Sequence, residues 1–314
     1  MKILLTGKTG QIGWELERIL PAIGTVVALD RRGLDLADPS SIRRAVSEIR
    51  PDLIVNAAAY TAVDLAEDEP ELAHAVNAEG PGILAEEAKK MGAALIHYST
   101  DYVFDGRKTS PYTEDDPTGP LNVYGKTKLA GEQAIQSIGV PHLIFRTSWV
   151  YSTRGKNFLL TIMRLACEKE ELRVVNDQIG CPNWSRSIAK ATASVIKYVS
   201  ISGNRVAING NSGIYHISGT RETTWYEFAR LILDNVTQAD VQDRSHQLMV
   251  RNVTPIATRD FPTRAVRPAY SLLCSAKVRE HFDVQLPDWK EQLQHCIQFM
   301  RQNNSDLRMR CEKT

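Results

Sequence analysis

Short, nearly continuous apolar runs dominate the first half of the chain. They cover residues 2–7, 25–30, 53–58, 94–100 and 142–150. A strand with only one buried face alternates apolar and polar residues, whereas a strand covered on both faces is apolar throughout, as in a parallel sheet. The pattern therefore predicts five buried parallel strands.

Segments with the spacing of amphipathic helices separate these runs. They cover residues 11–20, 39–49, 69–91 (as one or two helices) and 122–137. Pro39, which two serines follow, is a favourable helix start. Regular alternation of strands and helices predicts an α/β fold of the Rossmann type, in which a parallel sheet is doubly wound.

The pattern changes after about residue 150. Helices are expected at 157–169, 185–199 and 224–235, strands at 172–177 and 214–219, and a loop with Pro and Arg at 253–268. We predict a dinucleotide-binding domain over residues 1–150 and a smaller, mainly substrate-binding portion over residues 151–314. Segment 172–199 is also compatible with the sheet domain, so the two portions are expected to be interleaved.

Composition excludes several classes of function. The 314 residues are 43% hydrophobic and 24% charged, with a net charge of +1, so no bulk attraction to nucleic acid or to a membrane is expected. The five cysteines contain no C-x-x-C pair of the kind found in zinc sites. No apolar run approaches the roughly 18 residues of a membrane span, and no signal peptide is recognisable. We expect a cytoplasmic location.

A glycine motif, G-x-x-G-x-x-G, lies between the first predicted strand and the first helix. Gly7 would allow a tight turn, Gly10 a close approach of the backbone to a pyrophosphate, and Gly13 close packing of helix on strand. The free N–H groups of the helix N-terminus attract phosphate. The motif indicates dinucleotide binding, although a tight turn without a ligand could use the same glycines.

The end of the second predicted strand bears on the choice of cofactor. Asp30 is placed to bind the adenosine ribose hydroxyls, and Arg31 and Arg32 follow it. An arginine here can pair with the 2′-phosphate of NADPH, or can lie in a solvated turn. We expect NADPH to be favoured, with NADH as a second cofactor that Asp30 could bind.

Three side chains suggest the chemistry. Thr100 ends the fourth predicted strand, at the sheet edge where α/β proteins bind ligands, and Tyr124 and Lys128 are one helical turn apart. The lysine is expected to lower the tyrosine pKa from about 10, so that the phenol exchanges a proton near neutral pH. The alternative is that all three only satisfy structural hydrogen bonds.

Four motifs together resemble the extended short-chain dehydrogenase/reductases: T-G-x-x-G-x-x-G at 6–13, N-A-A-A at 56–59, S-T-D-Y-V-F-D-G at 99–106 and Y-x-x-x-K at 124–128. Stretches 7–16, 62–67, 124–132 and 146–151 resemble the branch that reduces dTDP-linked keto sugars. The likeness weakens after about residue 235. It implies that NADPH reduces the 4-keto group of dTDP-4-dehydro-β-L-rhamnose to give dTDP-L-rhamnose for surface polysaccharide.

The resemblance also implies roles for individual residues. Tyr124 would donate a proton, Lys128 would tune it and hold the nicotinamide ribose, and Thr100 would orient the carbonyl. Cofactor-binding positions, beyond the motif glycines, Asp30 and Arg31, would be Gln11, Ile12, Asp35, Leu36, Ala59, Tyr60, Thr61, Tyr124 and Lys128. Substrate-binding positions would be Thr100, Asp101 and Trp149.

Arginines in the loop at 253–268 are further candidates for substrate binding. Arg267, which precedes Pro268, is the best placed to contact the substrate diphosphate. Capping of carbonyl groups or a surface position would account for these arginines equally well.

Other functions remain open on sequence alone. Related 4,6-dehydratases carry Asp-Glu after the threonine, but Tyr102 follows Asp101 here, which disfavours dehydration. An epimerase, another nucleotide-sugar keto-reductase or a non-catalytic NADP-binding regulatory subunit would use the same fold.

The resemblance also has implications for the oligomeric state of the protein. It is compatible with a homodimer, and some family members dimerise around Mg²⁺ held by acidic side chains. Glu15 stands at one such position, but Arg186 falls where a further acid is found. We therefore expect no metal site.

Overall fold

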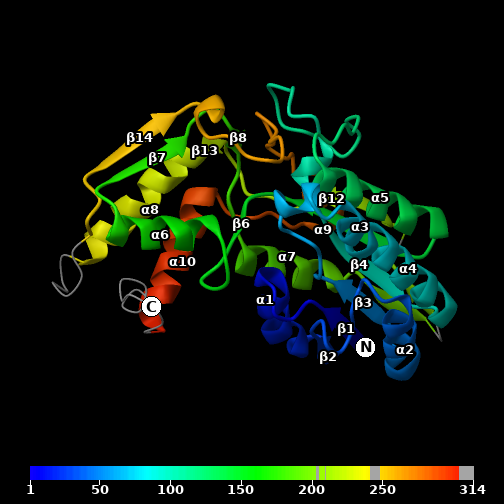
Figure 1. The fold of residues 1–314 in the computed structure, drawn as a ribbon. Helices are drawn as coiled ribbons and strands as arrows, with labels where there is room; N and C mark the ends of the chain where they lie inside the picture. The colour runs from blue at the N-terminus through cyan, green and yellow to red at the C-terminus, as the bar shows by residue number, and fades with distance from the viewer. Residues whose placement is uncertain (203–204, 209, 241–247, 304–314) are drawn as a thin grey trace.

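The computed structural model describes residues 1–202, 205–208, 210–240 and 248–303. Its centre is a parallel sheet with the strand order β12-β5-β4-β3-β1-β2 (Figure 1). The strands are β1 (Lys2–Thr6), β2 (Thr25–Leu29), β3 (Leu53–Asn56), β4 (Ala94–Thr100), β5 (His142–Thr147) and β12 (Gly213–His216). The five strands predicted before residue 150 are confirmed as β1 to β5, and the one predicted at 214–219 as β12.

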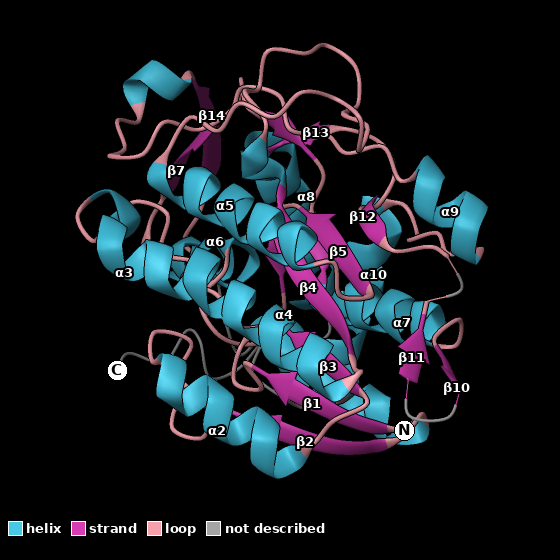
Figure 2. Cartoon of the chain, turned by 90° about the vertical axis from the view of Figure 1, so that its right-hand side faces the viewer, coloured by secondary structure: helices cyan, strands magenta, loops and turns pink. Residues whose placement is uncertain are grey.

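Alternate residues of each strand point to opposite faces of the sheet, and both faces are covered. One face packs on α2 (Pro39–Ile49), α4 (Gly80–Met91) and α5 (Val123–Ile138), which lie in front of the sheet in Figure 2. The other face packs on α1 (Gln11–Ile19) and α7 (Ser185–Ile196). The first face buries Leu4, Ile54, Leu95 and Ile144, and the second buries Leu5, Val55, Ile96 and Phe145. Burial on both faces explains why the strands read as continuous apolar runs.

The predicted helix at 69–91 is a continuous helical stretch in three pieces. It consists of α3 (Pro70–His74), a π-helical turn η3 (Ala75–Glu79) and α4. Short 3₁₀ turns occur at η1 (Leu20–Ala22), η2 (Leu65–Glu67), η4 (Asp101–Val103) and η5 (Thr258–Asp260). In the described part of the chain, no helix is long and apolar enough to cross a lipid bilayer.

A second core lies beside the sheet. It is formed by α6 (Phe158–Glu168), α8 (Trp225–Asp240) and α10 (Trp289–Gln302), with the parallel pair β7 (Glu171–Val175) and β14 (Asn252–Ile256). The prediction of a loop over 253–268 was wrong at its start, because residues 252–256 pair with β7. The helices α9 (Ala276–Phe282) and α10 were not predicted.

The chain passes more than once between the sheet and the second core. Strand β12 completes the six-stranded sheet although it lies beyond residue 150, whereas β7 pairs outside that sheet. Short pairs complete the fold: β6 (Val150–Tyr151) with β9 (Asn183–Trp184), β8 (Ile179–Gly180) with β13 (Thr223–Thr224), and β10 (Ser200–Ser202) with β11 (Arg205–Ala207). A domain limit at residue 150 stays a prediction.

The predicted strand at 142–150 ends earlier than expected. Strand β5 stops at Thr147, and Trp149 has a φ of 45°, in the left-handed region that no strand contains. The chain therefore turns out of the sheet two residues after β5 ends. This turn leads it toward the second core.

A buried ion pair joins helix α5 to strand β5. Glu132 and Arg146 are 1% and 2% exposed, and two hydrogen bonds of 2.9 and 2.6 Å link the guanidinium to the carboxylate. The hydroxyl of Ser99 donates a third bond to the same carboxylate. Because neither charge reaches water, each depends on the other.

We expect Glu132→Gln to lower the free energy of unfolding by about 3–5 kcal/mol, since it leaves the Arg146 charge buried without its counterion. Urea unfolding would measure the loss. Glu168→Gln is the matched control, because the exposed i,i+4 pair of Glu168 with Arg164 contributes less than about 0.5 kcal/mol. Equal losses in the two variants would contradict this account.

Candidate active site

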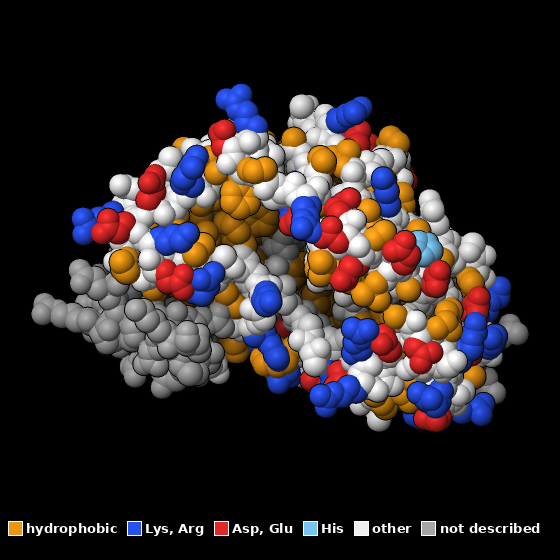
Figure 3. All heavy atoms as spheres, in the orientation of Figure 1, with side chains coloured by type: hydrophobic (Ala, Val, Ile, Leu, Met, Phe, Trp, Pro, Cys, Tyr) orange, Lys and Arg blue, Asp and Glu red, His pale blue; other side chains and the backbone are white. Residues whose placement is uncertain are grey.

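A cavity of about 760 Å³ opens at the carboxyl ends of the central strands. Its wall includes the turn after β1, the segment after β3, the end of β4 and the segment after β5. Figure 3 shows a hollow on this side of the molecule with hydrophobic side chains inside it. Open parallel sheets bind ligands at this edge, where the strand order reverses.

The glycine motif forms one end of the cavity. Gly7 has a φ of 71°, and a Cβ atom there would lie 2.7 Å from the amide nitrogen of Ala58. A Cβ atom on Gly13 would collide with the carbonyl oxygen of Gly7. Gly10 caps α1 without a side-chain hydrogen bond and lines the cavity with Gln11 and Ile12.

These features suit a dinucleotide. The open N-terminus of α1 faces the cavity with backbone amides that no capping side chain occupies, and such a terminus binds phosphate groups. The absence of side chains at Gly7 and Gly10 leaves space for a ligand to approach the backbone. The residues present are therefore compatible with the pyrophosphate of NAD(P).

Two acids and an arginine lie after β2. Arg31 and Asp35 both line the cavity and are joined by a 3.0 Å hydrogen bond from Arg31 Nε. Asp30 does not line it; its carboxylate instead accepts hydrogen bonds from the backbone N–H groups of Arg32 and Gly33. In this structure Asp30 thus holds the turn that carries Arg31.

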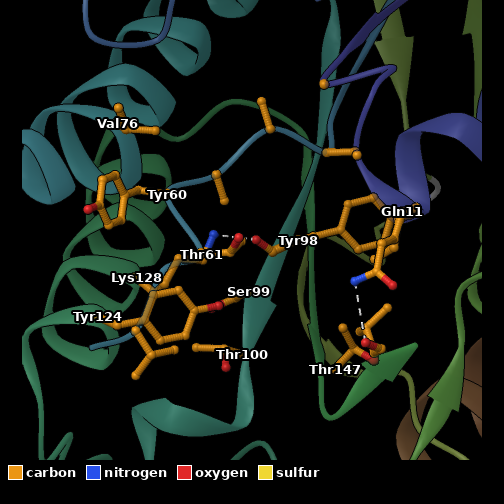
Figure 4. A pocket seen from close by; sticks show the side chains of 18 of the residues that line it. Gln11, Tyr60, Thr61, Val76, Tyr98, Ser99, Thr100, Tyr124, Lys128 and Thr147 are labelled. Carbon is orange, nitrogen blue, oxygen red and sulfur yellow. Dashed lines mark hydrogen bonds between the residues drawn. The ribbon is translucent and has the colours of Figure 1, made fainter. Parts of the chain in front are cut away.

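Thr100, Tyr124 and Lys128 meet at the centre of the cavity wall (Figure 4). Helix α5 carries the tyrosine and the lysine, and Asn122 begins this helix by accepting a hydrogen bond from the amide of Gly125. Thr100 is the last residue of β4, and its hydroxyl donates to Asp101 at 3.0 Å. The predicted set is brought together by two neighbouring elements.

The expectation that Lys128 lowers the Tyr124 pKa is wrong for this structure. Burial raises the pKa of Tyr124 to about 12, although the Thr100 hydroxyl opposes the shift. The amino group of Lys128 donates instead to the carbonyl of Tyr98 at 2.5 Å and lies 3.2 Å from Nε2 of His97. The lysine is thus held by strand β4 rather than by the phenol.

Burial also changes the other titratable groups of the site. It lowers the pKa of Lys128 to about 8, against the opposing charge of Glu132. It raises the pKa of Asp101 to about 7, opposed by hydrogen bonding of Ser271 and Thr100. Two groups that ordinarily titrate far from neutrality are therefore brought near it, which is typical of active sites.

Trp149 forms the wall of the cavity that faces the second core. Its ring stacks on Trp225, with centroids 3.5 Å apart and planes at 6°. A Cβ atom on Gly180 would lie 2.5 Å from the Trp149 ring, so this glycine makes room for it. Trp225 also lines the cavity but was not predicted, since nothing in the sequence links residue 225 to residue 149.

Most of the other predicted residues also line the cavity. They are Leu36, Ala59, Tyr60, Thr61 and Asp101. Asn77, which was not predicted, positions the backbone of Tyr60 through bonds of 2.9 and 3.0 Å to its N–H and carbonyl groups. A buried asparagine in a helical stretch gives no sequence signal for this role.

Arg267, predicted to contact the diphosphate, does not line the cavity. Its guanidinium makes hydrogen bonds of 2.9 and 2.6 Å to both carboxylate oxygens of Asp64. The pair ties the loop after β14 to the segment after β3. In this structure the arginine therefore anchors a loop.

Glu15 and Arg186, on which the expectation about a metal depended, contact each other. Arg186 Nε donates to the buried carboxylate of Glu15 at 2.8 Å and joins α7 to α1. Within the described residues, no group of three or more His, Cys, Asp or Glu side chains could hold a metal ion.

Comparisons with known proteins agree with this geometry. The chain is 46% identical over 297 residues to the dTDP-4-dehydrorhamnose reductase of Burkholderia thailandensis, covering 95% of this chain and 98% of that protein. It is 46% identical over 296 residues to the enzyme of the same name from Escherichia coli K12, covering 92% and 95%.

A solved structure shows the same fold. The dTDP-4-dehydrorhamnose reductase of Bacillus anthracis, solved in complex with NADP, superposes with a TM-score of 0.84 at 35% identity, covering 95% of this chain and 99% of that one. The family model of the RmlD substrate binding domain matches residues 1–302. The chain therefore belongs to the RmlD substrate binding domain family.

Proposed function

We propose that this protein is an oxidoreductase that uses NADPH to reduce the 4-keto group of dTDP-4-dehydro-β-L-rhamnose to dTDP-L-rhamnose. The observation that carries the proposal is the meeting of Thr100, Tyr124 and Lys128 in a cavity that also contains an open helix N-terminus. Relatives named dTDP-4-dehydrorhamnose reductase, which match nearly the whole chain, support the same substrate.

In this mechanism, the chemistry that NADPH would supply when bound is the hydride that adds to C4 of the sugar. Tyr124 donates its phenolic proton to the oxygen that becomes the alcohol, and a pKa of about 12 keeps the phenol protonated at neutral pH. The Thr100 hydroxyl orients the same oxygen from the end of β4. Lys128, as an ammonium, stabilises the developing charge and binds the nicotinamide ribose.

Different residues of the cavity wall would recognise the two ligands. Gln11, Ile12 and the segment 59–61 would bind the cofactor along the sheet edge. Asp101 and Trp149, which line the same cavity, would bind the sugar nucleotide. A cytoplasmic location and a homodimer stay predictions.

The preference for NADPH over NADH depends on Arg31. Its side chain is 74% exposed beside the cavity and is paired only with the partly exposed Asp35 among the described residues. A 2′-phosphate offers this guanidinium a stronger bidentate partner than a single carboxylate oxygen. The neighbouring Arg32 does not line the cavity.

Tyr124→Phe tests the reaction and the proton donor together. We expect the rate of NADPH absorbance loss with dTDP-4-dehydro-β-L-rhamnose to fall at least about 100-fold, because the proton donor is lost, while NADPH still binds. Tyr112→Phe is the control, since the Tyr112 hydroxyl bonds Asp105 outside the cavity. Wild-type protein that binds NADPH without oxidising it would contradict the proposed substrate, and an unimpaired Tyr124→Phe protein would contradict the role of the tyrosine.

Arg31→Ala tests the cofactor preference. We expect the KM for NADPH to rise about tenfold, because a charge-assisted contact to the 2′-phosphate is lost, and the KM for NADH to stay within about twofold. Arg32→Ala, one residue further along, should change neither value. A rise of equal size for both cofactors would show that Arg31 acts on the turn and not on the phosphate.

A further inference from the structure

A chain of buried polar side chains runs behind the cavity and ends at Lys128. It crosses three neighbouring strands, from Thr6 of β1 through Asn56 of β3 to His97 of β4, and reaches Lys128 on α5. All four side chains are at most 1% exposed. Because no water can rearrange around groups this deeply buried, their donors and acceptors must match one another.

The first link determines how the Asn56 amide is oriented. Its Oδ1 accepts a 2.6 Å bond from the Thr6 hydroxyl and a 3.3 Å bond from the backbone N–H of Ala58. A backbone N–H can only donate, so the amide oxygen, and not the NH₂ group, must face Ala58. The Nδ2 group is therefore directed to the other side.

The second link determines which nitrogen of His97 carries the proton. Asn56 Nδ2 lies 2.9 Å from Nδ1 of the ring, and an amide NH₂ group can only donate. Nδ1 must therefore accept, which leaves the proton of the neutral ring on Nε2. The ring is neutral because burial and the neighbouring Lys128 lower the pKa of His97 well below its usual value.

The third link conflicts with a charged lysine. With its proton on Nε2, the ring donates toward Lys128 Nζ across 3.2 Å. An ammonium has no lone pair to accept this bond, whereas an uncharged amine has one. The amine can also donate to the Tyr98 carbonyl, as the structure shows (Figure 4).

We infer that Asn56 fixes His97 as the Nε2–H tautomer, and that His97 is in turn a positioning residue that controls the protonation of Lys128. This inference rests on the proposed function, in which Lys128 takes part as an ammonium. The row of buried side chains behind the site opposes the positive charge of Lys128. The lysine is thus held ready to release or take up a proton while its amino group stays fixed beside the cavity.

Other titratable and charged groups lie on the elements around Lys128. The titratable and charged neighbours are His97 on β4, Asp101 on η4, Tyr124 and Glu132 on α5, and Arg146 on β5. The attraction of Glu132 for the ammonium is weakened by its bidentate pairing with Arg146. His97 differs from the other neighbours in that Asn56 determines which of its ring nitrogens carries the proton.

Nitrogen NMR of the cofactor-free protein tests the tautomer directly. With ¹⁵N-labelled histidine, the two ring nitrogens of each of the seven histidines give shifts that distinguish a protonated from an unprotonated nitrogen. The signals missing from His97→Gln identify residue 97. We expect a protonated Nε2 and an unprotonated Nδ1, and a proton on Nδ1 in the wild type would overturn the inference.

Two substitutions at Asn56 test the effect on Lys128. In Asn56→Asp, the carboxylate would accept a hydrogen bond from a protonated Nδ1 and so reverse the tautomer, but it also adds a negative charge. Asn56→Ala releases the ring from the constraint without adding charge. Both leave Nε2 free to accept from an ammonium, so both should move the basic limb of the kcat/KM profile upward by about one pH unit.

Thr6→Val is the matched control. It removes the hydroxyl from the chain, but the Ala58 N–H still orients the amide, so the basic limb should stay in place. A shift with Asn56→Asp and none with Asn56→Ala would show that added charge acts alone and would overturn the inference. Failure of the proposed function would appear separately, as wild-type protein that does not turn over while the histidine shifts still report the tautomer.

Discussion

The burial of the Lys128 amino group is the constraint on which the geometry of the site depends. A buried ammonium is costly unless acceptors surround it, and strand β4 supplies one. Pairing of β4 with β3 ends at His97, so Tyr98 is the first residue of β4 beyond the end of β3. Its carbonyl binds Lys128, and the strand continues to Thr100 paired only with β5. The unequal lengths of β3 and β4 thus create both the lysine site and the space in front of it.

Much of the fold follows from local rules that a single sequence exposes. Burial on both faces gives strands the continuous apolar runs that located β1 to β5, and the glycine motif marked the strand–helix turn. The residues expected at the cavity were mostly those at the ends of these strands, because parallel strands place their carboxyl ends along one edge. Gly7 follows β1 and Thr100 ends β4, and the structure places both around one cavity, together with Tyr124 of α5.

The remaining errors share a physical cause, which is dependence on partners distant in the sequence. Strand β14 forms because β7 lies beside it, 81 residues earlier in register, and its own sequence contains a proline and polar residues. Arg267 pairs with Asp64, which is 203 residues earlier in the sequence, instead of lining the cavity. The pKa of Tyr124 was misjudged because the i,i+4 spacing brings Lys128 near the phenol, but it does not reveal that β4 offers the ammonium a better acceptor.

The same dependence explains why the pKa of an active-site group is hard to read from a motif. The pattern Y-x-x-x-K specifies two side chains and their spacing on a helix, but in the arrangement inferred above the charge of the lysine depends on Asn56 of β3 and His97 of β4. These groups act through the direction of their hydrogen bonds. That direction is set where the backbone N–H of Ala58 orients the Asn56 amide. A side chain that never contacts a ligand can therefore control one that does, and the fold contributes to the chemistry by fixing donors and acceptors as well as positions.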